Sequence, residues 1–116
     1  IHDCQRALAL DSKSGPDDPQ LAFDLVCIGE AQLGRHDLAG ARASLERALR
    51  LREHADGDAG ELARTRFDLA KALADRARAR TLAIQARDGF AAAGEQWKAR
   101  HAEAIAWLAG RTDSRR

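Results

Sequence analysis

Methionine and tyrosine are absent from this chain of 116 residues, and aromatic residues make up only 4% of it. β-branched residues are also scarce, whereas sheet proteins are usually rich in them because they pack well on a pleated surface. Alanine and leucine supply most of the apolar residues, and both are strong helix formers, as are arginine and glutamate. The composition therefore predicts an all-α fold.

An excess of charge of one sign is also lacking: 19 basic and 18 acidic residues give a net charge of +1. This balance disfavours a general nucleic-acid or anionic-membrane surface. No apolar run approaches the roughly 18 residues of a transmembrane helix. We therefore expect a cytoplasmic protein whose partners include neither nucleic acid nor membrane.

Cysteine is nearly absent, since Cys4 and Cys27 are the only two. We interpret them as small buried thiols in preference to a disulfide. The histidines lie in separate segments, and no pair has the spacing of metal ligands on a helix. The acidic loop at 56–61 is too short for a calcium loop. We predict no metal site and no cofactor.

Catalytic motifs are lacking as well. The sequence contains no nucleophile elbow, no P-loop and no dinucleotide-binding fingerprint. We expect that the chain is not an enzyme and that any activity belongs to a domain outside it. Because the chain does not begin with methionine, we interpret it as a piece of a longer protein.

Breakers and caps divide the chain into helical segments. Asp18, Asp37 and Asp58 each stand where a carboxylate can cap the helix that follows. Apolar residues recur within the segments at steps of three and four, which is typical of amphipathic helices. We expect helices over residues 19–34, 37–54, 60–75, 76–93 and 95–109, after the end of another helix at 1–10. The short connections predict antiparallel hairpins.

Part of this pattern repeats along the chain. The motif Arg-Ala-Leu-x-Leu occurs at 6–10 and again at 47–51, and a weaker copy lies at 83–89. The helical segment 24–31 also matches segment 66–73. Self-similarity at a fixed spacing is typical of solenoids built from helical hairpins.

Residues 22–55 resemble a tetratricopeptide repeat (TPR), which is about 34 residues long. Ile28 and Gly29 fall on the family's Leu-Gly pair, and Ala41 falls on its invariant small residue. The resemblance implies a right-handed superhelical solenoid of antiparallel helix hairpins, in which Gly29 and Ala41 face each other at a helix crossing. It also assigns structural repeat positions to Leu25, Leu38, Leu45, Ala48, Leu69 and Ala86.

The spacing of the copies resembles the longer repeat of kinesin light chain, which is similar to arrays in bacterial signalling proteins such as Ser/Thr kinases. We expect a TPR domain over 1–110, made of the end of a preceding repeat (1–14), two repeats (18–55 and 58–93) and a capping helix (95–110), before a tail at 111–116. The turn of the second repeat looks shorter than that of the first. Either 74–78 is an unusually compact connection or residues are missing there.

The resemblance also implies a scaffold that binds a peptide or protein partner on its concave face, which the first helix of each repeat lines. The positions carried over to this face are Phe23, Val26, Glu30 and Leu33 in one repeat, Arg64, Phe67, Lys71 and Asp75 in the next, and Arg100 beyond them. Arg64 and Lys71 would attract carboxylates. The alternative is that Val26 and Phe67 belong to the core and that the charges form a solvated face.

Two other functions stay open. The helix at 1–10 lacks its hairpin partner, so its stripe of Cys4, Ala7 and Leu8 would be uncovered on one side. A homodimer through this N-terminal repeat face would make the chain a self-association or spacer element. The chain would otherwise be a regulatory accessory domain of an attached kinase or transcription regulator.

Overall fold

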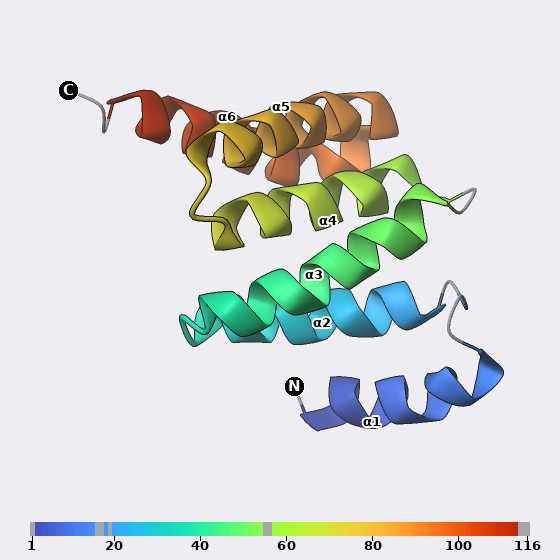
Figure 1. The fold of residues 1–116 in the computed structure, drawn as a ribbon. Coiled ribbons are helices and arrows are strands. Elements are labelled where there is room, and N and C mark those ends of the chain that lie inside the picture. Colours follow the sequence, from blue (N-terminus) through green and yellow to red (C-terminus); the bar gives the residue numbers. More distant parts are fainter. Residues whose placement is uncertain (1, 16–17, 19, 55–56, 114–116) are drawn as a thin grey trace. The chain divides into compact units, whose positions relative to one another are not determined.

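The computed structural model describes residues 2–15, 18, 20–54 and 57–113. Within these ranges every regular element is a helix, which confirms the predicted all-α class (Figure 1). The α-helices are α1 (His2–Asp11), α2 (Gln20–Gly34), α3 (Leu38–Glu53), α4 (Ala59–Ala72), α5 (Arg76–Ala93) and α6 (Lys98–Asp113). Short 3-10 helices cover Ser12–Ser14 (η1) and Glu95–Trp97 (η2).

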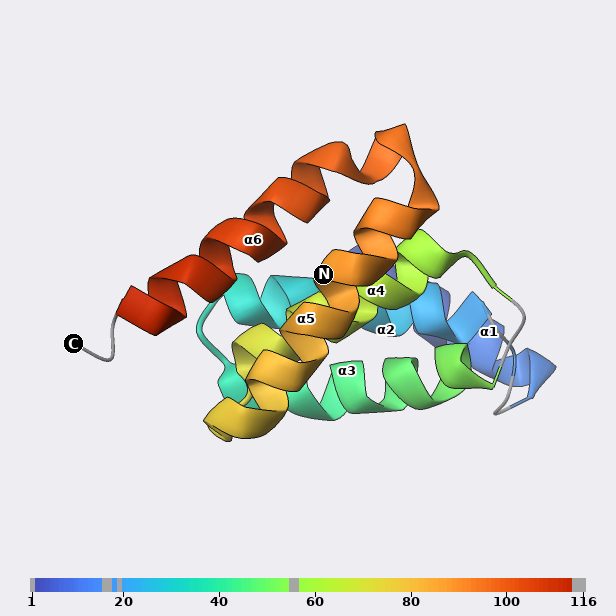
Figure 2. The same cartoon turned by 90° about the horizontal axis from the view of Figure 1, so that it is seen from above.

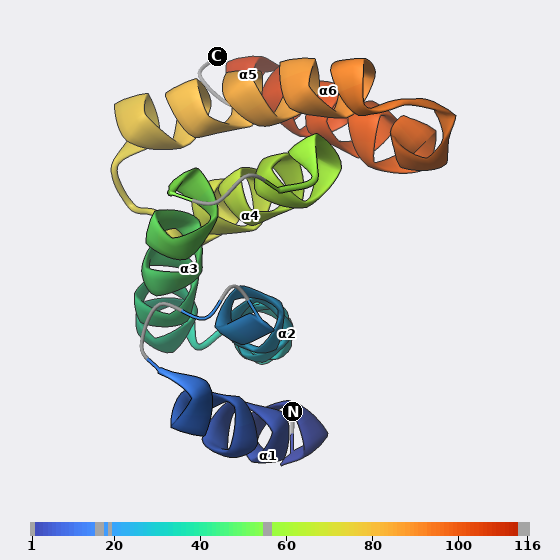
Figure 3. The ribbon, with the colours of Figure 1, turned by 90° about the vertical axis from the view of Figure 1, so that its right-hand side faces the viewer.

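The chain divides into two compact units, Ile1–Gly57 and Asp58–Arg116, which we call the N-terminal and C-terminal units. In the N-terminal unit α2 and α3 form a hairpin, and α1 packs beside α2 (Figure 3). In the C-terminal unit α4 and α5 form the corresponding hairpin. There α6 packs against α5 after the turn between them (Figure 2).

Aspartate caps begin four of the helices. The carboxylates of Asp18, Asp37 and Asp58 accept hydrogen bonds of 2.9, 3.0 and 2.7 Å from backbone N–H groups in the first turns of α2, α3 and α4. The sequence predicted these three caps, and they are confirmed. Asp75 is a fourth cap, since it accepts a 3.1 Å bond from the N–H of Arg78 at the start of α5. Each such cap stabilises a helix by about 1 kcal/mol.

The two hairpin connections have the same length, which contradicts the shorter turn expected in the second repeat. Residues 35–37 join α2 to α3, and residues 73–75 join α4 to α5. The helix α4 ends at Ala72 because Leu73 adopts an extended conformation, with φ −90° and ψ 137°. Residues 76–78, which we expected to belong to a compact connection, already form the first turn of α5.

The last helix also runs further than expected. Gly110 does not end α6, which continues to Asp113. A glycine inside a helix costs about 1 kcal/mol relative to alanine, and that cost alone does not terminate the helix. Of the expected tail, residues 111–113 are therefore helical, and 114–116 lie outside the described residues.

The core of the N-terminal unit lies between α2 and α3, where the buried side chains include Leu21, Leu25, Ile28, Ala41, Leu45, Ala48 and Leu49. Gly29 lets these helices approach closely. A Cβ atom on Gly29 would lie only 2.6 Å from Cγ of Leu45. The side chain nearest to Gly29 therefore belongs to Leu45, whereas the resemblance had pointed to Ala41, which is buried in the same core.

Most of the structural repeat positions are buried. Leu25, Ile28, Ala41, Leu45, Ala48, Leu69 and Ala86 are all less than 9% exposed, and Gly29 is buried too. The exception is Leu38, which is 47% exposed. It is the first residue of α3, directly after the cap Asp37, so this repeat position lies at the surface of the helix start.

The core of the C-terminal unit is built around two phenylalanines. Phe67 of α4 and Phe90 of α5 pack edge to face, with ring centroids 6.3 Å apart. The indole of Trp97 stacks on Phe90 at 5.7 Å, and that of Trp107 meets Phe67 edge to face at 6.1 Å. Ala104 of α6 completes this cluster. The two aromatic contacts therefore tie η2 and α6 to the α4–α5 hairpin.

Candidate interaction surfaces

On α2 of the N-terminal unit, one predicted binding residue is clearly accessible. Phe23 is 46% exposed, and the guanidinium carbon of Arg52 in α3 lies 4.4 Å from the centre of its ring. Glu30 and Leu33 are half-buried. Val26 is only 1% exposed and belongs to the core. The prediction that Val26 offers an apolar contact to a partner is therefore wrong. The alternative, that Val26 belongs to the core, is the one observed.

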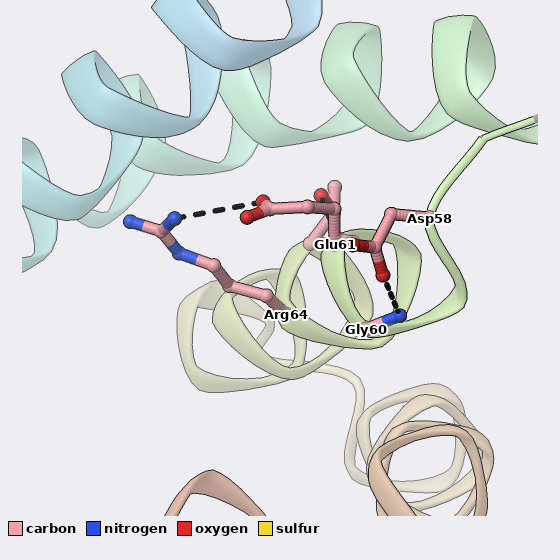
Figure 4. A network of polar contacts seen from close by, with 5 residues as sticks. Asp58, Gly60, Glu61 and Arg64 are labelled. Atoms are coloured by element: carbon pink, nitrogen blue, oxygen red, sulfur yellow. Dashed lines mark hydrogen bonds and ion pairs between the residues drawn. The ribbon is translucent and has the colours of Figure 1, made fainter. Parts of the chain in front are cut away.

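On α4 of the C-terminal unit, the two predicted cations lie one helical turn before and one turn after the buried Phe67. Phe67 is 2% exposed, so its predicted contact with a partner is wrong as well. Arg64, one turn before it, forms a 3.5 Å ion pair with Glu61 (Figure 4). Lys71, one turn after it, holds its ammonium group 4.6 Å from the centre of the Phe67 ring. Such a cation–π contact adds about 0.5–1 kcal/mol at an exposed site.

The remaining predicted residues divide between capping and the surface. Asp75 lies in the connection before α5 and caps that helix, so a structural role accounts for it. Arg100 is half-buried on α6, and Trp107 follows it by two turns of the same helix. Because residues seven apart share a helix face, Arg100 lies on the side of α6 whose Trp107 touches Phe67.

Buried carboxylates occur at matching places in the two units, and the sequence analysis did not single them out. Asp68 is 1% exposed, and its carboxylate lies 3.4 Å from the ammonium group of Lys71. Burial of a carboxylate is costly unless a cation or hydrogen bonds compensate for it. The signal was present in the sequence, because the tripeptide Phe-Asp-Leu occurs at 23–25 and again at 67–69.

Asp24, the other buried carboxylate, has carboxyl groups as neighbours instead. Its side chain is 7% exposed. Burial raises the pKa of Asp24 to about 6, helped by a hydrogen bond to Asp11 and by the negative charges of Asp11 and Asp18. The residue three positions further on, which in α4 is Lys71, is Cys27 in α2.

The two cysteines form a disulfide that links α1 to α2. The expectation of two buried thiols is wrong on both counts, since Cys27 is also exposed and Cys4 is only half-buried. Their Cα atoms lie 6.0 Å apart, within the range that suits a disulfide. Their separation of 23 residues gave no local sign of this pairing.

Within the described ranges, no group of three or more cysteine, histidine, aspartate or glutamate side chains is placed to hold a metal ion. None of the helices in those ranges is long and apolar enough to cross a membrane. Models of protein families, curated proteins and solved structures were compared with the chain, and none of them matches it.

Proposed function

We propose that this chain is a protein–protein interaction scaffold and that α4 and α6 of the C-terminal unit bind an acidic peptide segment. The observation that carries the proposal is that Lys71 and Trp107 both contact Phe67: the ammonium group of Lys71 lies over the ring, and Trp107 meets the ring edge to face. A cation and a half-buried indole therefore share this ring as a neighbour. We call Arg64, Lys71, Arg100 and Trp107 the α4–α6 surface.

The chemistry of this surface suits a partner with carboxylates beside an apolar side chain. Arginine and lysine form strong charge-assisted hydrogen bonds with carboxylates. Tryptophan and arginine are also the residues that most often dominate binding energy at interfaces. Glu61 and Asp68 already pair with Arg64 and Lys71, so a bound carboxylate has to compete with them. Binding should therefore be modest and should weaken as salt screens the charges.

The TPR resemblance supports the same surface. In TPR arrays the first helix of each hairpin lines the face that binds the partner. α4 is the first helix of its hairpin, and α6 follows the second helix of that hairpin. Phe23, Glu30 and Leu33 occupy the corresponding helix, α2, of the N-terminal unit, and they are secondary candidates for contact with a partner of that unit.

Fluorescence titration of the chain with a library of acidic peptides tests this proposal. Reversing a charge on the α4–α6 surface, as in Lys71→Glu or Arg100→Glu, should weaken the tightest peptide at least about tenfold, since loss of one buried charge pair costs more than 1.4 kcal/mol. Arg80→Glu makes the same change of charge at an exposed position of α5 and should leave affinity within about twofold.

Circular dichroism of each variant shows whether it is folded, and Arg100→Glu replaces Lys71→Glu if loss of the Asp68 pair unfolds the unit. The proposal fails if no acidic peptide binds at low salt. It also fails if Arg80→Glu weakens binding as much as the surface variants do.

One observation favours self-association as a second candidate function. Leu10 of α1 is 60% exposed, and Cys4, Ala7 and Leu8 are half-buried. A second copy of the chain that covers Leu10 and the exposed parts of these three side chains would bury apolar surface that one copy leaves in water. Analytical ultracentrifugation at increasing concentration tests it, and a strict monomer at the highest concentration rules it out.

A further inference from the structure

The first helix is the most weakly held element of the N-terminal unit. None of the described side chains of α1 is fully buried, whereas α2 and α3 each bury at least four. α1 packs against α2, and it is ten residues long. A helix of that length is marginal in water on its own, so its position depends on the few contacts it makes with α2.

Two of these contacts join opposite ends of α1 to α2. At one end Cys4 is bonded to Cys27. At the other end the carboxyl group of Asp11 is a neighbour of that of Asp24 and raises its pKa. Cys4 and Asp11 are seven residues apart and therefore share one face of α1. Among the described side chains, the α1–α2 contact thus includes one covalent bond, one carboxyl pair and half-buried apolar residues of α1.

The carboxyl pair holds α1 only while a proton is present. Asp18, in the segment before α2, adds a third negative charge beside Asp24. From the other side α3 contributes Arg52, whose guanidinium lies over the ring of Phe23. Because burial and Asp11 raise the pKa of Asp24 to about 6, Asp24 is mostly ionised at neutral pH. The charges of Asp11 and Asp24 then repel each other, which weakens this end of the contact and leaves the disulfide and the half-buried apolar side chains to hold the helix.

We propose that Cys4–Cys27 is a thiol–disulfide exchange site and that its reduction by a dithiol releases α1 from α2. The bond is accessible to a dithiol in solution because one of its cysteines is exposed. Cys27 is exposed and Cys4 is half-buried, so an incoming thiolate reaches Sγ of Cys27 first. This inference does not depend on the proposed peptide binding, since it concerns the other unit.

The exchange proceeds in two balanced steps. A thiolate of the dithiol attacks Sγ of Cys27, forming a mixed disulfide and expelling the thiolate of Cys4, which takes up a proton. The second thiolate of the dithiol then attacks the reductant's sulfur in the mixed disulfide. This forms a disulfide within the reductant and expels the thiolate of Cys27, which is protonated in turn. Two electrons pass to the protein and the dithiol is oxidised.

The size of the effect follows from the length of the loop that the bond closes. A crosslink between residues 23 apart removes chain entropy equivalent to a roughly 300-fold change in an opening equilibrium in the loop-closure treatment. Reduction should therefore increase the open population of α1 by that order. The hairpin of α2 and α3 has its own buried core and should remain folded.

Amide hydrogen exchange of the full chain, with and without dithiothreitol at pH 7.5, tests this inference. Protection of α1 amides should fall by two to three orders of magnitude on reduction, while α4 and α5 keep theirs. The double variant Cys4→Ser/Cys27→Ser should exchange like the reduced chain and should not respond to dithiothreitol. If that variant does not fold, the reduced wild-type chain supplies the same comparison.

Three results would overturn the inference. The first is a native chain, kept free of reductant, in which both cysteines react with a thiol reagent, because then no bond forms. The second is equal protection of α1 in the two redox states. The third is a joint loss of protection in α1, α2 and α3, because the bond then stabilises the whole unit and does not control α1 alone.

Discussion

Replacing Gly29 by alanine tests the close approach of α2 and α3. A Cβ atom at this position would lie 2.6, 2.7 and 3.2 Å from Cγ, Cδ2 and Cδ1 of Leu45. Leu45 is 0% exposed, so it has no free space into which it can turn. Overpacking of this kind costs about 1–3 kcal/mol. Alanine also favours the helix by about 1 kcal/mol over glycine, which leaves a net loss of about 0–2 kcal/mol.

Urea unfolding followed by circular dichroism measures this loss, with the redox state held constant. A loss of 1 kcal/mol lowers the Tm of a unit this small by about 4–8 °C. Gly110→Ala is the matched control, because a Cβ atom there meets nothing within 4 Å. Only the gain in helix propensity then applies, so Gly110→Ala should stabilise the protein by up to about 1 kcal/mol.

A double-mutant cycle separates the steric cause from the others. Leu45→Ala alone should cost about 2–5 kcal/mol, because it leaves a cavity. In the Leu45→Ala background, Gly29→Ala should be neutral or stabilising, which corresponds to a coupling of at least about 1 kcal/mol. The reasoning is refuted if Gly29→Ala stabilises the wild-type protein or if the two changes are additive.

Further predictions concern single side chains. The raised pKa of Asp24, about 6 against an ordinary 3.8, means that the folded unit binds the proton more tightly than the unfolded chain does. The contribution of Asp24 to the free energy of unfolding is therefore fully present below pH 4 and falls by up to about 3 kcal/mol as pH rises past 6. Asp24→Asn should abolish that fall in urea titrations from pH 4 to 8. Gly60→Ala should displace the indole of Trp97, which a Cβ atom would overlap, and shift its fluorescence; an unchanged spectrum would contradict the packing. Asp75→Ala should lower the free energy of unfolding by about 1 kcal/mol in thermal melts, because Asp75 acts as a cap. Peptide affinity should be unchanged, and a loss of affinity would support the predicted role of Asp75 in binding.

The helices and most of their caps could be predicted from the sequence because their signals are local. Asp18, Asp37 and Asp58 stand beside glycines, a proline or a polar turn, and these mark helix ends. Asp75 lacks such a sign, since Leu73 and Ala74 continue a good helical pattern before it. The end of α4 is set by the extended conformation of Leu73, and no glycine or proline beside Leu73 predicts it.

The interaction surface was harder to predict because burial depends on neighbours that are distant in sequence. A helical pattern shows that Val26 and Phe67 are apolar, but not whether a partner or the core covers them. Phe67 is buried because Phe90 and Trp107, from two later helices, pack on its ring. The pairing of Cys4 with Cys27 likewise depends on α1 packing against α2, which spacing along the chain does not show.

The two Phe-Asp-Leu segments show how the same three residues take different roles. Phe67 is covered by aromatic rings, whereas Phe23 is 46% exposed beneath Arg52. Both aspartates are buried. The ammonium group of Lys71 lies beside Asp68, whereas Asp24 has Cys27 at the equivalent position, three residues on. Burial and the neighbouring carboxyl groups of Asp11 and Asp18 raise the pKa of Asp24, and the cation beside Asp68 suggests how to lower it.

Cys27→Lys should give Asp24 the cation that Asp68 already has. Cys27 is exposed, as is Lys71, so the longer side chain has room in water. Because the substitution also removes the disulfide, its proper reference is Cys27→Ser. Relative to that reference, an adjacent ammonium group should lower the pKa of Asp24 and add stability above pH 6. Carboxyl chemical shifts followed by NMR from pH 3 to 8 measure the pKa directly. If the titration of Asp24 is the same in both variants, an ammonium group three residues on does not compensate a buried carboxylate in this unit, and the comparison with the Asp68–Lys71 pair is refuted.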